Sequence, residues 1–262
     1  MGDPCLRYER RDAVAIININ HPARLNAMSF HMWQQLSGLV TRANDDEAVR
    51  VIAVSGEGEK AFSAGADISQ FDERRSAVAA VAEYEAVVAD GLAALETSSK
   101  PTVALVRGIC YGGGVVLALG CDLRFVRQDS RFCVPAARLG IGYATSNIAL
   151  MIKKLGVGPT SDILMSARVL DADEALRLGI ANMVWTQAGF EEGAAAALRT
   201  IAGNAPLTLR AIKRGITELT KADIDRDLSA ADLAVSQCFL SEDYREGQKA
   251  FLEKRDPQFS GR

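Results

Sequence analysis

The stretch RGICYGGGVVLALGCD, residues 107–122, decides how the rest of this chain can be interpreted. It follows an apolar run at 103–106, and its three consecutive glycines, Gly112 to Gly114, precede an apolar segment at 115–119. This pattern predicts a buried strand, a tight loop and the start of a buried helix. The first N–H groups of a helix have no partner within it, so they could hold an oxygen that develops negative charge. The glycines could equally serve only close packing of the helix against the strand.

A second segment, FSAGADI at 62–68, has a similar construction. It follows the apolar run at 51–54 and the turn at 56–58. Residues 61–70 are therefore predicted to form a loop of small residues that leads towards a helix. Two such loops, each presenting one free N–H group, would form an oxyanion hole if they met on one carbonyl oxygen.

In this order and spacing, FSAGADI at 62–68, GGG at 112–114 and GCD at 120–122 resemble the crotonase (enoyl-CoA hydratase/isomerase) superfamily. The resemblance extends from the first predicted strand to Phe259. It implies an α/β fold, with a crotonase-like spiral of ββα units over residues 1–200 and a C-terminal helical region over 201–262 that covers the pocket and forms the oligomer. It also implies a homotrimer or hexamer, an acyl-CoA substrate and no permanently bound cofactor, because the coenzyme A moiety is part of the substrate.

The resemblance assigns roles to individual residues. The N–H groups of Ala66 and Gly113 would hold the thioester oxygen as an enolate develops, and one such donor is worth about 2.7–4 kcal/mol of transition-state stabilisation. The residues expected at the coenzyme A moiety are Arg24, Ala64, Asp67, Ile68, Phe251 and Lys254. From the residues alone, Arg24 could also be an ordinary surface arginine, and 251–255 an ordinary helix face.

The acid–base groups of a hydratase are where this sequence departs from the family pattern. Hydratases of the family add water with two glutamates, and the matching positions here are Val116 and Ala136. With Ile141, these two side chains would line the acyl pocket instead. Neither can transfer a proton, although addition of water needs a positioned base and acid. The two-glutamate mechanism is therefore not expected.

Tyr143 is the main remaining candidate for a polar catalytic group. The pattern LGIGY at 139–143 resembles the Leu-Gly-x-x-Tyr of the methylmalonyl-CoA decarboxylase branch, although that branch tends to have a histidine at the position of Ala66. A phenol with its ordinary pKa near ~10 is a poor base at neutral pH, but it can donate a hydrogen bond or a proton. Decarboxylation suits such a site because loss of CO₂ forms the enolate without a base. Alternatively, Tyr143 has no catalytic role and is a loop tyrosine with its ring packed and its hydroxyl in water.

Three functions remain open from the residues. The chain could decarboxylate a malonyl-type thioester, it could be a conventional enoyl-CoA hydratase or isomerase that uses other polar groups, or it could bind acyl-CoA without catalysis. A dinucleotide-binding domain fits poorly because the three glycines lack the GxGxxG spacing. Glu83 and Glu85, in the helix predicted at 72–96, are expected to be solvated.

Composition limits the partners and the compartment. A net charge of −3 without a long Lys/Arg cluster argues against nucleic acid binding. No segment is long and apolar enough to span a membrane, and no signal peptide is evident, so the expected location is cytoplasmic. The five cysteines form no CxxC pair, and no His/Cys/Asp group has metal-ligand spacing. We therefore expect reduced, buried thiols and no metal.

Hydrophobic periodicity and turn residues predict the remaining elements. Further strands are predicted at 13–19, 122–127 and 180–186. Further helices are predicted at 29–43 with Ser29 as N-cap, at 148–155, from a capping box of Asp171 and Glu174 to Gly179, and at 190–203, 206–220 and 222–254. Residues 130–147 are predicted to be mostly loop.

Overall fold

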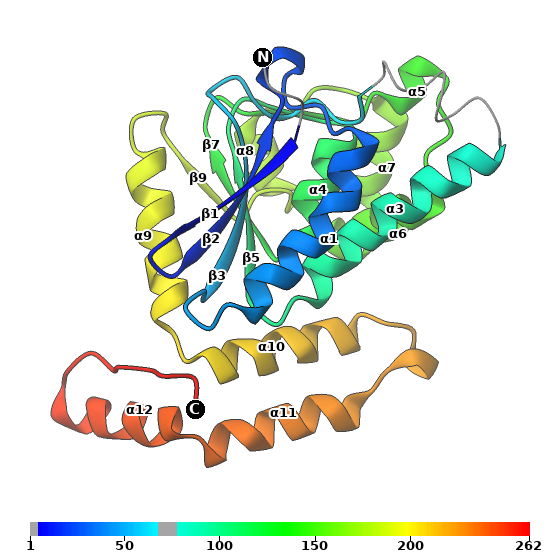
Figure 1. Ribbon diagram of the computed structural model, residues 1–262. Helices are drawn as coiled ribbons and strands as arrows, with labels where there is room; N and C mark the ends of the chain where they lie inside the picture. The colour runs from blue at the N-terminus through cyan, green and yellow to red at the C-terminus, as the bar shows by residue number, and fades with distance from the viewer. Residues whose placement is uncertain (1–4, 68–77) are drawn as a thin grey trace.

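The computed structural model describes residues 5–67 and 78–262 of the chain. Its core contains two sheets, and Figure 1 shows the larger one at the centre of the molecule. The larger sheet has the strand order β1 (Cys5–Arg11), β2 (Val14–Asn20), β3 (Val51–Gly56), β5 (Thr102–Val106), β7 (Leu123–Arg127) and β9 (Met183–Trp185). The smaller sheet has the order β4 (Ala61–Ser63), β6 (Ile109–Tyr111) and β8 (Arg131–Cys133).

Successive strands divide between the two sheets. In the larger sheet β3, β5 and β7 pair in parallel, and the short strand that follows each of them joins the smaller sheet, also in parallel. Parallel neighbours need a crossover connection, and helices supply it: β4 precedes α3 (Val78–Thr97) and β6 precedes α4 (Gly113–Gly120). The predicted α/β spiral of ββα units, followed by a helical C-terminal region, is therefore confirmed.

Helices cover both faces of the larger sheet. α1 (Phe30–Asp45), α3 and α4 lie on one side of it, and α9 (Phe190–Gly203) lies on the other (Figure 1). The strands β3 and β5 carry apolar residues at most positions because both of their faces are covered. α9 completes a second apolar cluster made of Val51, Val103, Phe125, Phe190, Ala194 and Leu198.

The predicted helix starts are confirmed where a capping side chain was recognised. Ser29 caps α1, because its hydroxyl accepts a hydrogen bond from the N–H of Met32 at 3.2 Å. Asp171 and Glu174 form the predicted capping box at the start of α8 (Ala172–Arg177). The loop between β2 and α1 also contains a 3₁₀ turn, η1 (Pro22–Arg24).

The prediction of loops at 61–70 and 130–147 is wrong in part. Strands β4 and β8 begin these segments, and helices α5 (Ala136–Leu139) and α6 (Thr145–Leu155) occupy much of the second. Strands of three residues are too short to show a periodic pattern. β4 and β8 form because each pairs in parallel with β6, which lies between them. Helix α7 (Val157–Ser166) lies where no element was predicted.

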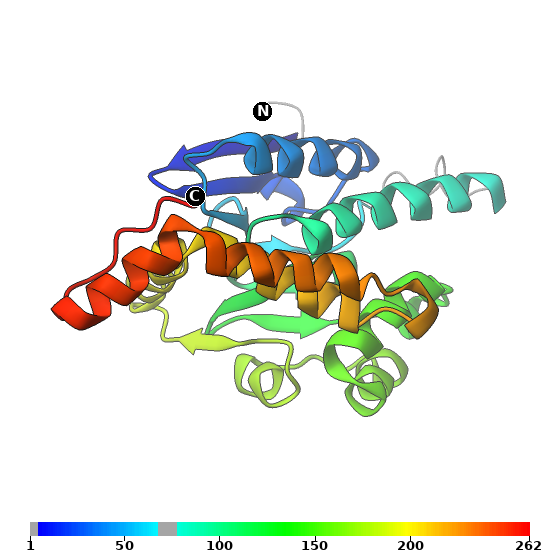
Figure 2. The same cartoon turned by 90° about the horizontal axis from the view of Figure 1, so that it is seen from below.

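The C-terminal region is a set of helices beneath the core. α10 (Pro206–Leu219) packs on α11 (Leu228–Leu240), with the 3₁₀ turn η3 (Asp223–Asp225) between them, and α12 (Glu242–Glu253) follows (Figure 2). The prediction of one helix over 222–254 is wrong because Ser241, in an extended conformation, caps α12 by accepting from the N–H of Tyr244 at 3.0 Å. The division into units 1–200 and 201–262 stays a prediction.

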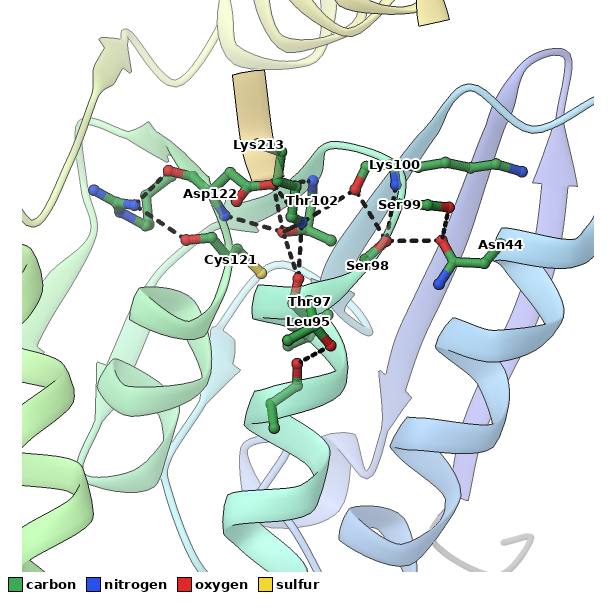
Figure 3. A network of polar contacts seen from close by, with 12 residues as sticks. Asn44, Leu95, Thr97, Ser98, Ser99, Lys100, Thr102, Cys121, Asp122 and Lys213 are labelled. Carbon is green, nitrogen blue, oxygen red and sulfur yellow. Dashed lines mark hydrogen bonds and ion pairs between the residues drawn. The ribbon is translucent and has the colours of Figure 1, made fainter. Parts of the chain in front are cut away.

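A buried lysine ties α10 to the core (Figure 3). The ammonium of Lys213 donates to Asp122 Oδ2 at 2.7 Å and to the carbonyl oxygen of Leu95 at 2.8 Å. The same carboxylate accepts from the N–H and hydroxyl of Thr102 at 2.8 and 3.0 Å. Asp122 therefore has a structural role, joining Lys213 of α10 to the start of β5, while Lys213 itself contacts the end of α3.

The cysteines are all free thiols. Cys110, Cys121 and Cys133 are buried as predicted, whereas Cys5 and Cys238 are partly exposed. Among the described residues, no helix has both the length and the apolar character that crossing a membrane requires.

Candidate active site

The two glycine-containing loops meet at the start of α4. Gly112, the N-cap of α4, has φ +50°, and Gly113 is the first helical residue. A Cβ atom built on Gly113 would lie 3.5 Å from the nitrogen of Ala66, and one built on Gly65 would lie 3.0 Å from the nitrogen of Gly113. The N–H groups of Ala66 and Gly113, 47 positions apart in the chain, are thus neighbours in the fold.

The N–H group of Ala66 faces away from the strand-like contact that holds its loop. Met28 donates to the carbonyl oxygen of Gly65 at 2.7 Å and accepts from the N–H of Asp67 at 3.0 Å. Because successive N–H groups of an extended segment alternate in direction, the N–H of Ala66 points to the opposite side. No acceptor within residues 5–67 and 78–262 takes the N–H of Ala66 or of Gly113.

Close contact between the loops depends on Gly114. A Cβ atom at this position would lie 2.4 Å from the carbonyl oxygen of Ser63 and 3.0 Å from the Ser63 Cβ. Any side chain would therefore push α4 away from β4 and separate the two N–H groups. The close contact with Ser63 explains why the third residue of the run is glycine, and this reason involves packing alone, not a ligand.

A cavity of about 610 Å³ opens beside the two N–H groups. The backbone and side chains of both loops form one wall, together with Val116 from α4. The segment from β8 to α6 forms another wall, and α1 and α3 close the third. Five of the predicted residues line the cavity in addition to Ala66 and Gly113, namely Ala64, Val116, Ala136, Ile141 and Tyr143.

The remaining predicted residues that the structure describes lie outside the cavity wall. Arg24 contacts Asp67 with 3.3 Å between Nη1 and Oδ1, which places a half-exposed guanidinium beside the Ala66 loop. Ile68 lies outside the described residues. Phe251 and Lys254, at the end of α12, are exposed and do not line the cavity of their own chain.

Tyr143 points its polar end into the interior. Its hydroxyl is buried and has no hydrogen-bond partner among the described residues. Burial raises the pKa of the phenol well above its ordinary value near 10. The group therefore stays protonated at neutral pH, so it can donate a hydrogen bond but cannot serve as a base.

The contribution of α1 and α3 to the cavity was not predicted. Trp33 comes from α1, and Val81, Tyr84, Glu85 and Val88 come from one face of α3. Their spacing of three, four and seven residues is that of one helix face, but α3 is apolar at most positions, so the sequence alone does not show which face turns inward. Glu85 is exposed, as expected, yet it also lines the cavity; Glu83, two residues earlier, does not.

The titratable groups at the cavity are few. Glu85 is the only carboxylate among the described lining residues, and no lysine, arginine or histidine lines the cavity in that part of the chain. Thr145, Ser146 and Asn147, at the start of α6, supply further polar groups at the wall. Within the described ranges, no cluster of three His, Cys, Asp or Glu residues is placed to hold a metal ion.

Comparisons with known proteins agree with this architecture. The sequence profile of the enoyl-CoA hydratase/isomerase family matches residues 9–262. A crotonyl-CoA hydratase from Syntrophomonas wolfei is 34% identical over 251 residues, which cover 96% of each chain. A short-chain-enoyl-CoA hydratase from Clostridium acetobutylicum is 31% identical and covers 94% of each chain. The crystal structure of an enoyl-CoA hydratase/carnithine racemase from Magnetospirillum magneticum superposes with a TM-score of 0.92 at 31% identity, over 98% of this chain and 96% of that one. The chain therefore belongs to the enoyl-CoA hydratase/isomerase family, whose enzymes act on coenzyme A thioesters.

Proposed function

We propose that this protein binds an acyl-CoA thioester with its carbonyl oxygen between the N–H groups of Ala66 and Gly113, and that it catalyses reactions through the enolate. The convergence of these two donors, neither of which has an acceptor in the described chain, carries the proposal. A donor of this kind contributes most when negative charge develops on the oxygen. Arg24, beside Asp67 at the edge of the loop, would face the phosphates of coenzyme A, and Ala64, on the cavity wall, would flank its thioester end.

We further propose that catalysis does not use two glutamates. By the family resemblance, Val116 and Ala136 stand where hydratases have their acid and base, and both line the cavity. The reaction that needs least from such a wall is decarboxylation of a malonyl-type thioester. In that reaction the bond between Cα and the carboxylate breaks, its electron pair enters the enolate, and CO₂ leaves. Tyr143, kept protonated by burial, would donate a hydrogen bond to the substrate, and a proton from solvent would then add to Cα to give the acyl-CoA product.

A second candidate is hydration or isomerisation of an enoyl thioester with a different acid–base group. Glu85 favours it, because its carboxylate lies on the α3 face that lines the cavity. The hydratase names of the relatives support the same reaction class. The third candidate is binding of acyl-CoA without catalysis, because a chain with Val116 and Ala136 in place of the two glutamates could have lost its activity.

Mass spectrometry of an acyl-CoA panel incubated with the protein in ¹⁸O-labelled water separates these candidates. Loss of CO₂ from a malonyl-type thioester supports the decarboxylase. Uptake of label by an enoyl thioester supports the hydratase, and Glu85→Gln should then abolish it while Glu83→Gln should not. Thioesters that keep both their mass and, by NMR, their double-bond position leave the binding protein, with binding shown separately.

Gly113→Ala tests the oxyanion site itself. The added methyl group meets only ordinary contacts, at 3.5 Å or more, so the fold should survive, but it lies beside the position of the thioester oxygen. Because the methyl group would displace the thioester oxygen from the N–H, we expect turnover to fall by about 10²–10³, the loss measured when one oxyanion donor is removed. Gly38→Ala, on α1 with open space around it, is the matched control. Full activity of the Gly113 variant would refute the assignment.

We also propose that the chain assembles as a trimer or a hexamer. The C-terminal helices expose large apolar side chains, among them Ile216, Leu233, Phe239 and Leu240, at 59% to 78%. Such surface is commonly covered by association. Phe251 and Lys254 would then reach the adenosine end of coenzyme A on a neighbouring subunit. Light scattering coupled to size-exclusion chromatography tests the assembly, and a monomer at micromolar concentration would refute it.

A further inference from the structure

A buried asparagine, Asn26, lies in the loop between β2 and α1 and does not line the cavity. It is 1% exposed, and its φ of +56° is a left-handed conformation that asparagine tolerates better than most residues. Its side-chain amide donates to the carbonyl oxygens of Ala61 and Glu57 at 2.7 and 2.9 Å. Its side-chain oxygen accepts from the N–H of His21 at 3.1 Å. Both amide hydrogens and the oxygen are therefore used inside the protein.

The position of this amide depends on a glycine at the end of β3. A Cβ atom on Gly56 would lie 2.7 Å from Asn26 Nδ2 and 2.4 Å from the carbonyl oxygen of Ala61. Glycine at position 56 thus leaves room for the amide. One acceptor lies in the turn after β3 and the other at the first residue of β4, so Asn26 fixes the β2–α1 loop to the start of β4.

The backbone of Met28, two residues after Asn26, sets the direction of the Ala66 N–H group. Met28 donates to the carbonyl oxygen of Gly65 at 2.7 Å. This carbonyl and the N–H of Ala66 belong to one peptide group, which is planar and trans, so the two point in opposite directions. A hydrogen bond that keeps the carbonyl on the side of Met28 therefore keeps the N–H on the other side, beside Gly113.

Neighbouring contacts restrain the same segment. Leu25, one residue before Asn26, accepts from the N–H of Ala64 at 2.9 Å, and the Ser63 hydroxyl accepts from the N–H of Gly65 at 3.2 Å. The β2–α1 loop and β4 thus fix the segment that carries the Ala66 donor.

We propose that Asn26 is a positioning residue of the oxyanion site. Its amide fixes the β2–α1 loop, and this loop holds the peptide group of Gly65 and Ala66 with its N–H towards the thioester oxygen. The inference rests on the proposed binding of the thioester between Ala66 and Gly113. Without the amide, two buried carbonyl oxygens lose their donor and the loop can move. An oxyanion donor is effective because it is oriented before the reaction, so a misdirected N–H contributes little.

Two substitutions remove the amide in different ways. Asn26→Gly tolerates the positive φ and leaves the two carbonyl oxygens without a donor. Asn26→Asp keeps the size of the side chain but places a carboxyl oxygen against those carbonyl oxygens. Lys213→Met is the matched control, because it also removes a buried donor to carbonyl oxygens, and its contacts include no residue of the β2–α1 loop or of the Ala66 loop. The control should lower stability without moving the Ala66 N–H.

The carbonyl stretch of a bound thioester reports the two N–H donors without requiring turnover. Hydrogen bonds to a carbonyl oxygen lower this frequency, and infrared spectra of butyryl-CoA with ¹²C or ¹³C at the carbonyl isolate it. We expect a lower frequency in the wild-type complex than in free butyryl-CoA. Each Asn26 variant should lose about half of this shift, because one of two donors is misdirected. Lys213→Met should keep the full shift.

Turnover supplies a second readout where the acyl-CoA panel identifies a reaction. The Asn26 variants should lower kcat and kcat/KM by a similar factor, on the order of 10²–10³, and leave KM nearly unchanged, because the lost interaction is made mainly in the transition state. A full shift in both variants would overturn the inference, as would an equal loss in Lys213→Met. Absence of a shift in the wild-type complex would instead overturn the proposed function, and this inference with it.

Hydrogen exchange of the unliganded wild type gives a test that does not depend on the folding of any variant. If Asn26 fixes the loop, its side-chain N–H groups and the backbone N–H of Met28 are released by the same local opening. We therefore expect both to exchange with the same opening free energy, measured by ¹⁵N NMR. Fast exchange of the Asn26 amide with slow exchange of the Met28 N–H would show that the loop is held without it, and would overturn the inference.

Discussion

Replacing Lys213 with methionine would remove the cation that joins α10 to the core. The Lys213 side chain is only 8% exposed, and its ammonium donates to Asp122 and to the carbonyl oxygens of Leu95 and Lys100, at 2.7, 2.8 and 3.1 Å (Figure 3). Methionine keeps most of the apolar stem but offers no donor. The substitution thus leaves one carboxylate and two carbonyl oxygens without the group that neutralised them.

The magnitude follows from the environment of the remaining partner. Breaking a buried ion pair by removing one member costs about 3–5 kcal/mol. Asp122 is 29% exposed and keeps its two hydrogen bonds from Thr102, so the lower end of the range, about 3 kcal/mol, is appropriate. For a chain of this size, that loss corresponds to a decrease of about 6–12 °C in melting temperature.

Urea unfolding of the wild type and the variant, followed by circular dichroism, measures the change. Lys153→Met is the control, because Lys153 pairs with Glu96 at 3.2 Å near the surface, with side chains 27% and 23% exposed. Removing such a pair should cost about 0–1 kcal/mol. Limited proteolysis should also cut the Lys213 variant between α9 and α10 sooner than the wild type. Equal destabilisation by the two substitutions would refute the argument that burial makes the Lys213 contact strong.

Three further predictions concern other parts of the structure. Gly114→Ala should lower both thermal stability and turnover, because its Cβ would lie 2.4 Å from a backbone oxygen of the neighbouring loop; unchanged melting temperature and kcat would contradict this contact. In the native protein, Cys110 and Cys121 should react with a thiol reagent only after unfolding, since burial raises the pKa of both thiols, that of Cys121 to about 12; rapid labelling of either, mapped by mass spectrometry, would be contrary evidence. The hydrogen bond from Arg255 lowers the pKa of Glu246 to about 2, so this carboxylate stabilises the fold above its unfolded pKa near 4.5, and the stabilisation is lost as the pH falls from there towards 2. The melting temperature of Glu246→Gln should therefore depend less on pH across that range than that of the wild type, and equal slopes would argue against the contact.

The sequence was sufficient to predict that the two glycine-containing loops meet. Glycine runs are specific signals, because only glycine tolerates the positive φ of Gly112 and the close approach at Gly114. The capping residues Ser29, Asp171 and Glu174 were recognisable because each makes its capping hydrogen bond with a residue three positions away. Features that are built from neighbouring residues were therefore predicted well.

Features that depend on distant partners were not predicted. Strands β4 and β8 are three residues long, and only their pairing with β6 makes them strands. Lys213 looks like an ordinary helical lysine until the fold brings it to Asp122, 91 positions away. The position of Glu85 on the cavity wall likewise depends on which face α3 turns inward, and an almost uniformly apolar helix with a few charged residues leaves that face undetermined.

Family membership implies the backbone contacts of the proposed site, but it leaves the side-chain contacts at the acyl end open. The donors that would hold the thioester oxygen are backbone groups of Ala66 and Gly113, so they persist when side chains change, and any acyl-CoA offers the same oxygen to them. The acyl end meets side chains instead, and Trp33 and Tyr143 belong to neither glycine motif. Substitutions at such positions can change the accepted acyl group or the reaction while the two N–H groups stay in place. The reaction of this chain must therefore be established from the side chains of the cavity wall.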